Sequence, residues 1–222
     1  MIESDAPDAY FDRYGGLGPL HRGVSMIARR LGLLAPLAAL SLSACGLNSV
    51  PTAEEQVNAA WGNLQSEYQR RSDLIPNLVA TVQGYAKQER DVLIEVTEAR
   101  ASAGRVQLSA ADLDDPEKVR AFNEAQSRLT AAIIPLQRLQ EAYPELKSNA
   151  NFLALQSQIE GTENSILVGR RDYNEAVRAY NTRIRTFPDA IGAKIFYGAE
   201  PKVPFEAASG AQNAPKVDFN AS

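Results

Sequence analysis

Apolar side chains recur at alternating spacings of three and four residues along most of this 222-residue chain. This spacing forms an apolar stripe along one face of an α-helix and lets helices pack as in a coiled coil. Three such stripes cover residues 52–103, 116–143 and 152–187. Single alternation of apolar and polar side chains, which is typical of a β-strand, does not extend over a comparable length between residues 52 and 187. The sequence therefore predicts an all-α fold.

The first stripe predicts one long helix over residues 52–103. From Thr52 the sequence has the spacing of a capping box, and Gly104 offers a stop at the other end. A continuous helix of this length would reach about 75 Å. Pro76 lies inside it and has no N–H group, so it frees the carbonyl of Ser72 and predicts a kink.

Turn and stop signals predict the other helices. Asp115-Pro116-Glu117 supplies an N-cap, a first-turn proline and a first-turn acid, so a second helix begins there and ends at Tyr143-Pro144. The third stripe ends before Pro188. A short helix over residues 189–197 is then expected to cover the end of the bundle with Ile191, Ile195 and Phe196.

Short loops between long helices favour antiparallel packing. For residues 52–198 we therefore expect a long antiparallel helical bundle of three long helices plus a short fourth, with coiled-coil-like packing. Because the first helix is the longest, part of it would stay unpaired, and either this overhang or the fourth helix folded back would offer a surface to a partner. Residues 199–222 are rich in small and polar residues and prolines, which predicts an extended flap and then a disordered tail.

An export signal precedes the helical part. Residues 31–44 form an uncharged, mostly apolar run that is shorter than the about 20 residues needed to span a bilayer. Two arginines stand before this run, as in a signal peptide. The four residues that end at Cys45, Leu-Ser-Ala-Cys, resemble the lipobox of bacterial lipoproteins, in which the Cys thiol is lipidated. We therefore predict a lipoprotein signal peptide over residues 26–44 and a lipidated anchor and linker over residues 45–51.

The start of the chain does not fit a signal peptide. Residues 1–25 carry four acidic side chains where positive charge is expected, so we predict that translation begins at Met26 and that these residues are a mis-assigned start or an upstream extension. Gly46 follows the lipidated Cys45. By resemblance to lipoproteins of double-membraned bacteria, this glycine favours the outer membrane, facing the periplasm. The membrane is thus an expected partner through the lipid anchor.

Composition removes several classes of function. The chain has one Cys, Cys45, and one His, His21, so it cannot assemble a disulfide framework, a Cys/His zinc site or a nucleophile paired with His in the exported part. Its 23 Lys and Arg residues are scattered among 27 Asp and Glu residues. We therefore expect no concentrated basic patch that could bind nucleic acid. We expect no enzymatic activity, no metal and no cofactor.

Polar and charged residues gather around Pro76. They are Arg70, Arg71, Asp73 and Asn77, and Arg71 falls on the apolar stripe itself. One interpretation is a binding site for an acidic group, because the guanidinium fork matches carboxylate or phosphate. The other is a buried Arg71 paired with a carboxylate of another helix, for which Glu124 and Glu163 are candidates.

A second cluster lies on the third stripe. It covers residues 170–181 and includes the candidate site residues Arg171, Tyr173, Asn174, Arg178 and Asn181. Asn174 and Asn181 are one heptad apart and share a helix face with Arg178. One interpretation is a polar ladder across the bundle. The tyrosines at helical spacing favour the other interpretation, a place in the core with the hydroxyl groups at its rim.

These two clusters resemble the most characteristic stretches of the LemA family of bacterial envelope proteins. The first match is RRSDLIPNLV at residues 70–79, followed by Gly84-Tyr85-Ala86 and Glu98-Ala99-Arg100. The second match is residues 171–181 with Phe187-Pro188. Trp61 and Phe205-Glu206 also match the family pattern. The resemblance covers residues 48–206 or so.

The resemblance implies an all-helical bundle that its amino terminus holds at a membrane, without an established enzymatic activity or cofactor. This sequence departs from the family pattern in two respects. Many members are anchored by a transmembrane helix, where this chain has a lipobox. Many also carry His just before the position of Glu89, where this chain has Gln88, so a His-dependent role does not carry over.

We therefore expect a membrane-anchored lipoprotein that acts as a non-enzymatic scaffold or adaptor for an envelope protein. The alternative is a binding module for an acidic envelope ligand, such as a peptide carboxylate or a cell-wall fragment, that binds through Arg70, Arg71 and Arg178. The candidate surface comprises Arg70, Arg71, Asp73, Asn77, Tyr85, Arg100, Arg171, Tyr173, Asn174, Arg178 and Asn181. The sequence leaves the partner, the biological process and homo-oligomer formation open.

Overall fold

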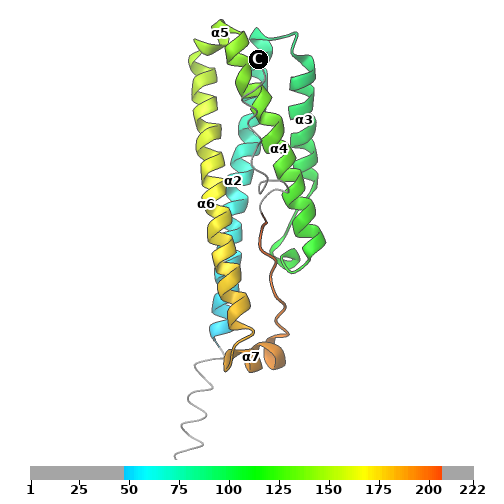
Figure 1. Cartoon of the computed structure of the whole chain (residues 1–222), viewed down its shortest axis with the longest axis vertical. Coiled ribbons are helices and arrows are strands. Elements are labelled where there is room, and N and C mark those ends of the chain that lie inside the picture. The colour runs from blue at the N-terminus through cyan, green and yellow to red at the C-terminus, as the bar shows by residue number, and fades with distance from the viewer. Residues whose placement is uncertain (1–47, 207–222) are drawn as a thin grey trace, which may run out of the picture. The chain divides into compact units, whose positions relative to one another are not determined.

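The computed structural model describes residues 48–206. The expected start at Met26, the signal peptide, the lipidation site Cys45 and the tail from residue 207 onward lie outside the described residues. The described part contains no β-strand, and its helices pack against one another (Figure 1). The predicted all-α helical bundle is therefore confirmed.

Long helices of alternating direction form the bundle (Figure 1). They are α2 (Ser49–Tyr85), α3 (Arg90–Arg105), α4 (Pro116–Ala142) and α6 (Ala150–Arg183). Helix α2 packs mainly against α6, and α3 packs mainly against α4. The single turn α5 (Pro144–Lys147) joins α4 to α6, and the 3-10 turn η1 (Ala110–Asp112) lies in the loop between α3 and α4.

The predicted single helix over residues 52–103 is wrong, because the chain forms two helices there. Helix α2 ends at Tyr85, and α3 begins at Arg90 and runs back along the bundle (Figure 1). Between them Ala86 has φ −124° and ψ 56°, which is not helical, and its side chain is fully buried. Because the chain folds back, α6 pairs with α2 and the expected unpaired overhang of the first helix does not exist.

The start of α2 also differs from the prediction. The helix begins at Ser49, and Thr52 lies inside it, where its Oγ1 donates to the carbonyl of Asn48 at 2.7 Å. The capping box predicted at Thr52 is therefore wrong. Pro51 lies in the first turn, where a backbone N–H has no intrahelical partner, so the proline does not interrupt the helix.

Side-chain caps set the starts of α4 and α6. The Asp115 carboxylate accepts hydrogen bonds from the N–H groups of Glu117 at 2.9 Å and Lys118 at 3.2 Å, which confirms the predicted start of α4. Asn149 caps α6 in the same way, through the N–H of Phe152 at 2.9 Å.

Two clusters of buried side chains fill the bundle. The first lies between the long helices and includes Leu78, Val96, Leu136 and Phe152. The second lies along α2 and α6 toward the bundle end where α2 begins, and it includes Trp61, Leu113, Tyr173 and Phe205. The stripe of α2 runs through both clusters. Arg71 lies on this stripe where the two clusters meet, between Tyr68 and Ile75.

The segment after α6 lies at the bundle end where α2 begins, since α7 (Asp189–Gly192) contacts α2. This helix and the π-helical turn η2 (Ala193–Tyr197) follow α6 there. The predicted short helix is therefore present, but its expected orientation is wrong. Ile191, Ile195 and Phe196 are exposed by 53%, 70% and 66%. The small residues Gly192 and Ala193 are buried instead, which lets this segment lie close to the bundle with its apolar side chains outward.

Candidate functional site

An extended segment, residues 199–206, runs back along α6 after η2, and we call it the strap (Figure 1). Gly198 makes the turn into it with φ 54°, a left-handed conformation that glycine adopts without steric cost. The Ala199 N–H donates to the carbonyl of Ala193 at 3.0 Å and closes this turn.

Two asparagines of α6 bind the strap by a pair of hydrogen bonds each. Asn174 donates from Nδ2 to the carbonyl of Phe205 at 2.8 Å and accepts from the Phe205 N–H at 2.8 Å. Asn181 makes the same pair with Lys202, at 2.7 Å and 2.9 Å. Each carboxamide therefore satisfies backbone groups that a neighbouring strand would satisfy in a sheet.

The spacing of the asparagines matches that of the strap. Asn174 and Asn181 are seven helical residues apart, a rise of about 10.5 Å. Lys202 and Phe205 are three extended residues apart, a rise of about 10 Å. The polar ladder considered from the sequence is thus present, but its partner is the backbone of the chain's own strap rather than another helix.

Other groups tie the strap to α2 and to the loop between α3 and α4. Lys202 is only 8% exposed, and its Nζ lies 3.3 Å from Oε1 of Glu54 and 3.9 Å from Oδ2 of Asp114. The Val203 N–H donates to the carbonyl of Leu113 at 2.8 Å. The strap is therefore an integral part of this end of the bundle.

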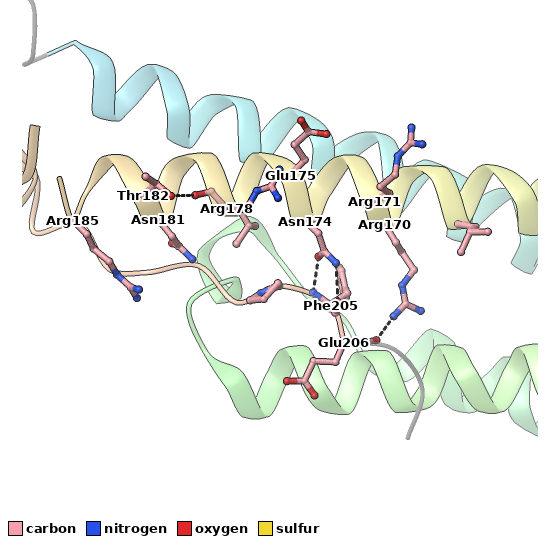
Figure 2. Close-up of a pocket in the computed structure, with 13 residues that line it drawn as sticks. Arg170, Arg171, Asn174, Glu175, Arg178, Asn181, Thr182, Arg185, Phe205 and Glu206 are labelled. Carbon is pink, nitrogen blue, oxygen red and sulfur yellow. Dashed lines mark hydrogen bonds between the residues drawn. The ribbon is translucent and has the colours of Figure 1, made fainter. Parts of the chain in front are cut away.

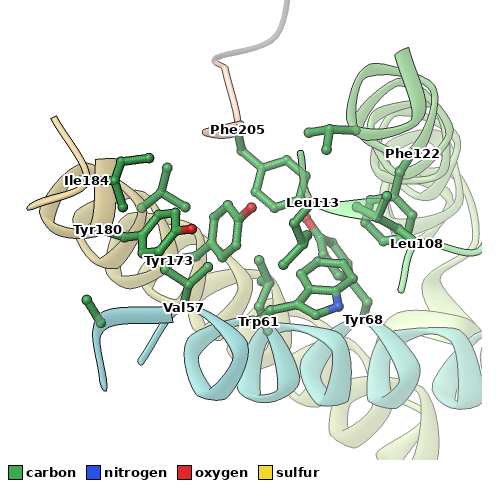
Figure 3. Close-up of a cluster of buried hydrophobic side chains, with 14 of the residues drawn as sticks. Val57, Trp61, Tyr68, Leu108, Leu113, Phe122, Tyr173, Tyr180, Ile184 and Phe205 are labelled. Carbon is green, nitrogen blue, oxygen red and sulfur yellow. The ribbon is translucent and has the colours of Figure 1, made fainter. Parts of the chain in front are cut away.

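The Phe205 ring completes an aromatic cluster (Figure 3). Its centroid lies 5.0 Å from that of Tyr173, 5.9 Å from that of Trp61 and 6.2 Å from that of Phe122. The Tyr173 hydroxyl donates to the carbonyl of Val203 at 3.0 Å, and burial raises the pKa of this tyrosine. Tyr173 is fully buried, so it belongs to the core and not to a partner surface.

A groove of about 1110 Å³ lies between α6 and the strap (Figure 2). The apolar part of its lining includes Leu167, Val177 and Pro204. The charged part consists of Arg170, Arg171, Arg178, Arg185, Glu175 and Glu206. The groove therefore brings four guanidinium groups and two carboxylates together.

Two of these four arginines already bind other groups of the chain. Arg170 donates to the carbonyl of Glu206 at 2.6 Å and lies 5.4 Å above the Phe205 ring. Arg171 lies 3.2 Å from the carboxylate of its neighbour Asp172. The side chains of Arg178 and Arg185 make no ion pair or hydrogen bond within residues 48–206. These two side chains are exposed and can bind an acidic group.

A model of the LemA family matches residues 60–219 of this chain. The chain belongs to the LemA family. This result confirms the resemblance seen in the motifs around Pro76 and Asn174. The strap and the groove beside it lie within the matched residues, so the site is part of the LemA-family domain.

Curated relatives agree with this assignment. The LemA protein of Metamycoplasma hominis is 25% identical over 140 residues, which cover 63% of this chain and 60% of that protein. Two magnetosome proteins of Paramagnetospirillum magneticum, MamQ 1 and MamQ 2, are each 26% identical over 189 residues, which cover 78% of this chain and 68% of theirs. The family and these relatives indicate a membrane-associated envelope protein.

In this LemA-family chain Arg71 is a core residue. It is 1% exposed, and its Nη1 donates to Oε1 of Glu163 at 2.8 Å and to Oγ1 of Thr130 at 2.7 Å. Its Nη2 donates to Oε1 of Gln126 at 2.5 Å. The expected pairing with a carboxylate of another helix is confirmed, with Glu163 rather than Glu124. Arg71 is therefore unavailable to a ligand at the surface.

The remaining residues of the first motif are dispersed over α2 and α3. Arg70, Asp73 and Asn77 are exposed on α2 and do not line the groove. Tyr85 accepts a hydrogen bond from Asn149 at 2.7 Å at the far end of the bundle. Arg100 donates to a backbone carbonyl of α2. The structure does not bring these side chains together with Arg171 and Arg178 in one site.

Two arginines of the groove, Arg170 and Arg185, were not among the site residues expected from the sequence, although Arg170 belongs to the second cluster. Arg170 stands next to the predicted site residue Arg171, and Arg185 follows Arg178 by one heptad, as Arg178 follows Arg171. This seven-residue spacing was the available signal for Arg185. Nothing in the sequence indicated that the strap would form the opposite wall of the groove, because its contacts are made by backbone atoms.

Two further findings concern residues 48–206 alone. No group of three or more His, Cys, Asp or Glu side chains in this part could hold a metal ion. None of its helices is both long and apolar enough to cross a membrane.

Proposed function

We propose that this LemA-family protein is a lipid-anchored, non-enzymatic adaptor of the bacterial envelope and that its α6 groove binds an acidic segment of a partner protein. The observation that carries the proposal is the pair of exposed, unpaired side chains Arg178 and Arg185 in the groove beside the strap. Arginine at such positions is typical of protein interfaces, where its planar fork binds carboxylates.

The shape of the groove favours a polypeptide over a small ligand. Arg171 and Arg178 are seven residues apart in α6, a rise of about 10.5 Å, and Arg185 lies two residues beyond the end of the helix. A single carboxylate or phosphate would contact one or two guanidinium groups over this length. An extended peptide with several acidic residues would contact more of them, and its apolar side chains would meet Leu167 and Pro204.

The proposed anchoring rests on the sequence before α2. The lipobox at Cys45 supplies a lipidated amino terminus, and Gly46 favours the outer membrane, facing the periplasm. The several acyl chains of a lipoprotein bind a bilayer durably, because each buried methylene adds about 0.8 kcal/mol. The test of the anchoring is the intact mass of the protein from its own cells, which should begin at Cys45 and include the lipid.

The docking surface is tested by photo-crosslinking in the native cells. A benzoylphenylalanine replaces Leu167, which lines the groove and is 69% exposed. The same label at Ile134, 43% exposed on α4, is the matched control. A second pair of variants compares Arg178→Glu/Arg185→Glu with Arg128→Glu/Arg138→Glu, which makes the same change of charge on α4.

The proposal predicts crosslinks from position 167 to a segment rich in Asp and Glu. The Arg178→Glu/Arg185→Glu variant should lose these crosslinks, and the α4 variant should keep them. Binding of the purified partner should weaken as salt rises, because exposed charges are screened. Crosslinks that survive the charge reversal would contradict the proposal. Thermal stabilisation by a diglutamate peptide, without any crosslinked protein, would instead favour a small acidic ligand.

A further inference from the structure

The end of the bundle carries a cluster of exposed apolar side chains in residues 187–197, which we call the apolar tip. Phe187, Ile195 and Phe196 are exposed by 82%, 70% and 66%. Ile191 and Tyr197 are exposed by 53% and 45%. Scattered apolar residues are normal on a protein surface, but a contiguous group of large ones marks an interaction site.

Basic side chains lie within and just before the apolar tip, and the exposed acid Glu200 follows it in the strap. Lys194 lies within the tip, and Arg183 and Arg185 precede it, all three exposed. The acidic residue of the tip, Asp189, already has two partners. Its Oδ2 accepts a hydrogen bond from the Ser49 hydroxyl at 2.6 Å and lies 3.9 Å from Nε of Arg183. Large apolar and aromatic side chains beside Lys and Arg are typical of protein segments that lie in a membrane interface.

The covalent chain places this surface near the proposed lipid anchor. Ser49 is hydrogen-bonded to Asp189 and therefore lies at the tip. Cys45 precedes Asn48 by three residues, and three extended residues span at most about 11 Å. A lipid on Cys45 would therefore hold the tip within a few residues' length of the bilayer surface.

We propose that the apolar tip inserts into the interfacial layer of the membrane that holds the lipid anchor. The side chains of Phe187, Ile195 and Phe196 enter the boundary between headgroups and acyl chains. Lys194 remains at the level of the lipid phosphates, as long basic side chains do at interfaces. This second contact restricts how the bundle can tilt on its tether, and it sets the height of the groove above the bilayer. It rests on the lipidation of Cys45 in the proposed function.

The test measures the contact between the tip and lipid by tryptophan fluorescence. Phe196→Trp places a reporter in the tip, and Leu153→Trp places one on α6 near α5, where the native side chain is 45% exposed. The native Trp61 is 2% exposed, so the wild type supplies a common background for subtraction. Each full-length variant is purified from cell membranes and reconstituted into vesicles of phosphatidylcholine and phosphatidylglycerol with brominated acyl chains. Intact mass determines whether Cys45 is lipidated, and far-UV circular dichroism confirms the fold.

The expected result is a blue-shifted emission of the tip reporter in Phe196→Trp that loses most of its intensity to bromine, while the α6 reporter in Leu153→Trp is unchanged. A lipidated, vesicle-bound protein whose tip reporter is not quenched would overturn the inference and leave the proposed anchoring intact. An unlipidated protein whose tip reporter is still quenched would overturn the anchoring but support insertion of the tip, which would then bind the bilayer without the lipid. A blue shift without quenching, together with crosslinks between tips, would assign the surface to a second copy of the chain and overturn the inference.

Discussion

Arg100 of α3 donates a hydrogen bond of 2.7 Å from its Nε to the backbone carbonyl oxygen of Ser72 in α2. This carbonyl is the one that Pro76 leaves without an intrahelical donor, because proline has no N–H group. Helix α2 thus continues through Pro76 while a charged side chain from the next helix satisfies the freed acceptor. The two motif stretches around Pro76 and Arg100 are therefore linked by one hydrogen bond between helices.

A double-mutant cycle tests this link. Arg100→Met should lower the free energy of unfolding by about 1–2 kcal/mol, since it removes a charged donor from a partly buried carbonyl. In a Pro76→Ala background the new N–H can bond to the Ser72 carbonyl, so the same substitution should cost about 1 kcal/mol less. Urea unfolding followed by circular dichroism measures both values. Arg138→Met, on α4, is the control, and equal costs of Arg100→Met in the two backgrounds would contradict the account.

The buried Arg71 network yields a second prediction. Glu163→Ala leaves a 1% exposed guanidinium without its carboxylate, so it should destabilise the bundle by about 2–3 kcal/mol. Adding Arg71→Met removes the buried charge and should recover part of this loss. Urea unfolding of the single and double variants gives the comparison. Glu160→Ala, one turn away and exposed, should change stability by less than about 0.5 kcal/mol. A Glu163 variant no less stable than this control would refute the role of the ion pair.

Local signals in the sequence predicted most helix ends but missed the reversal after Tyr85. Asp115 and Pro144 mark the ends of α4 because caps and prolines act within one turn of the chain. The turn at residues 86–89 does not interrupt the three-four spacing, since Val82 and Val92 keep the same register across it. After the reversal α3 packs against α4, and a contact between helices is not visible in the local spacing of apolar residues.

The candidate site could be predicted only in part, for a related reason. The sequence marked Asn174, Asn181 and Tyr173 as unusual on a helix face. Their partners are backbone atoms of the strap, and a backbone N–H or carbonyl looks the same in every residue. Phe205 was recognised only through the family resemblance, since its place beside Trp61 depends on how the whole chain folds back.

The strap provides a third prediction through its protected lysine. Asn174→Asp keeps the acceptor for the Phe205 N–H but loses the donor to the Phe205 carbonyl. Opening of the strap should then become easier by about 1.4 kcal/mol, so trypsin should cleave after Lys202 about tenfold faster. Mass spectrometry of timed digests identifies this cut. Asn77→Asp, exposed on α2, is the matched control. Equal cleavage rates in the two variants would show that the asparagine does not hold the strap.

Alkaline pH should weaken the bundle through Tyr180. Burial, and after it the nearby carboxylates of Glu54, Asp114 and Glu200, raise the pKa of Tyr180 from 10.0 to about 12. The folded state therefore favours the neutral phenol, and this contribution to stability is complete below pH 10 and is lost as the pH rises toward 12. Urea unfolding between these pH values should show a steep decline for the wild type.

Tyr180→Phe should show a shallower decline, because it removes the titrating group and keeps the ring. Val177→Ala, a buried neighbour on α6 without a titrating side chain, should lower the stability by a similar amount at every pH and leave the slope unchanged. Ultraviolet absorbance of tyrosinate, measured on the folded protein, should show one fewer late-titrating tyrosine in the Tyr180→Phe variant. The same slope in Tyr180→Phe and the wild type would exclude Tyr180 as the source of the alkaline instability.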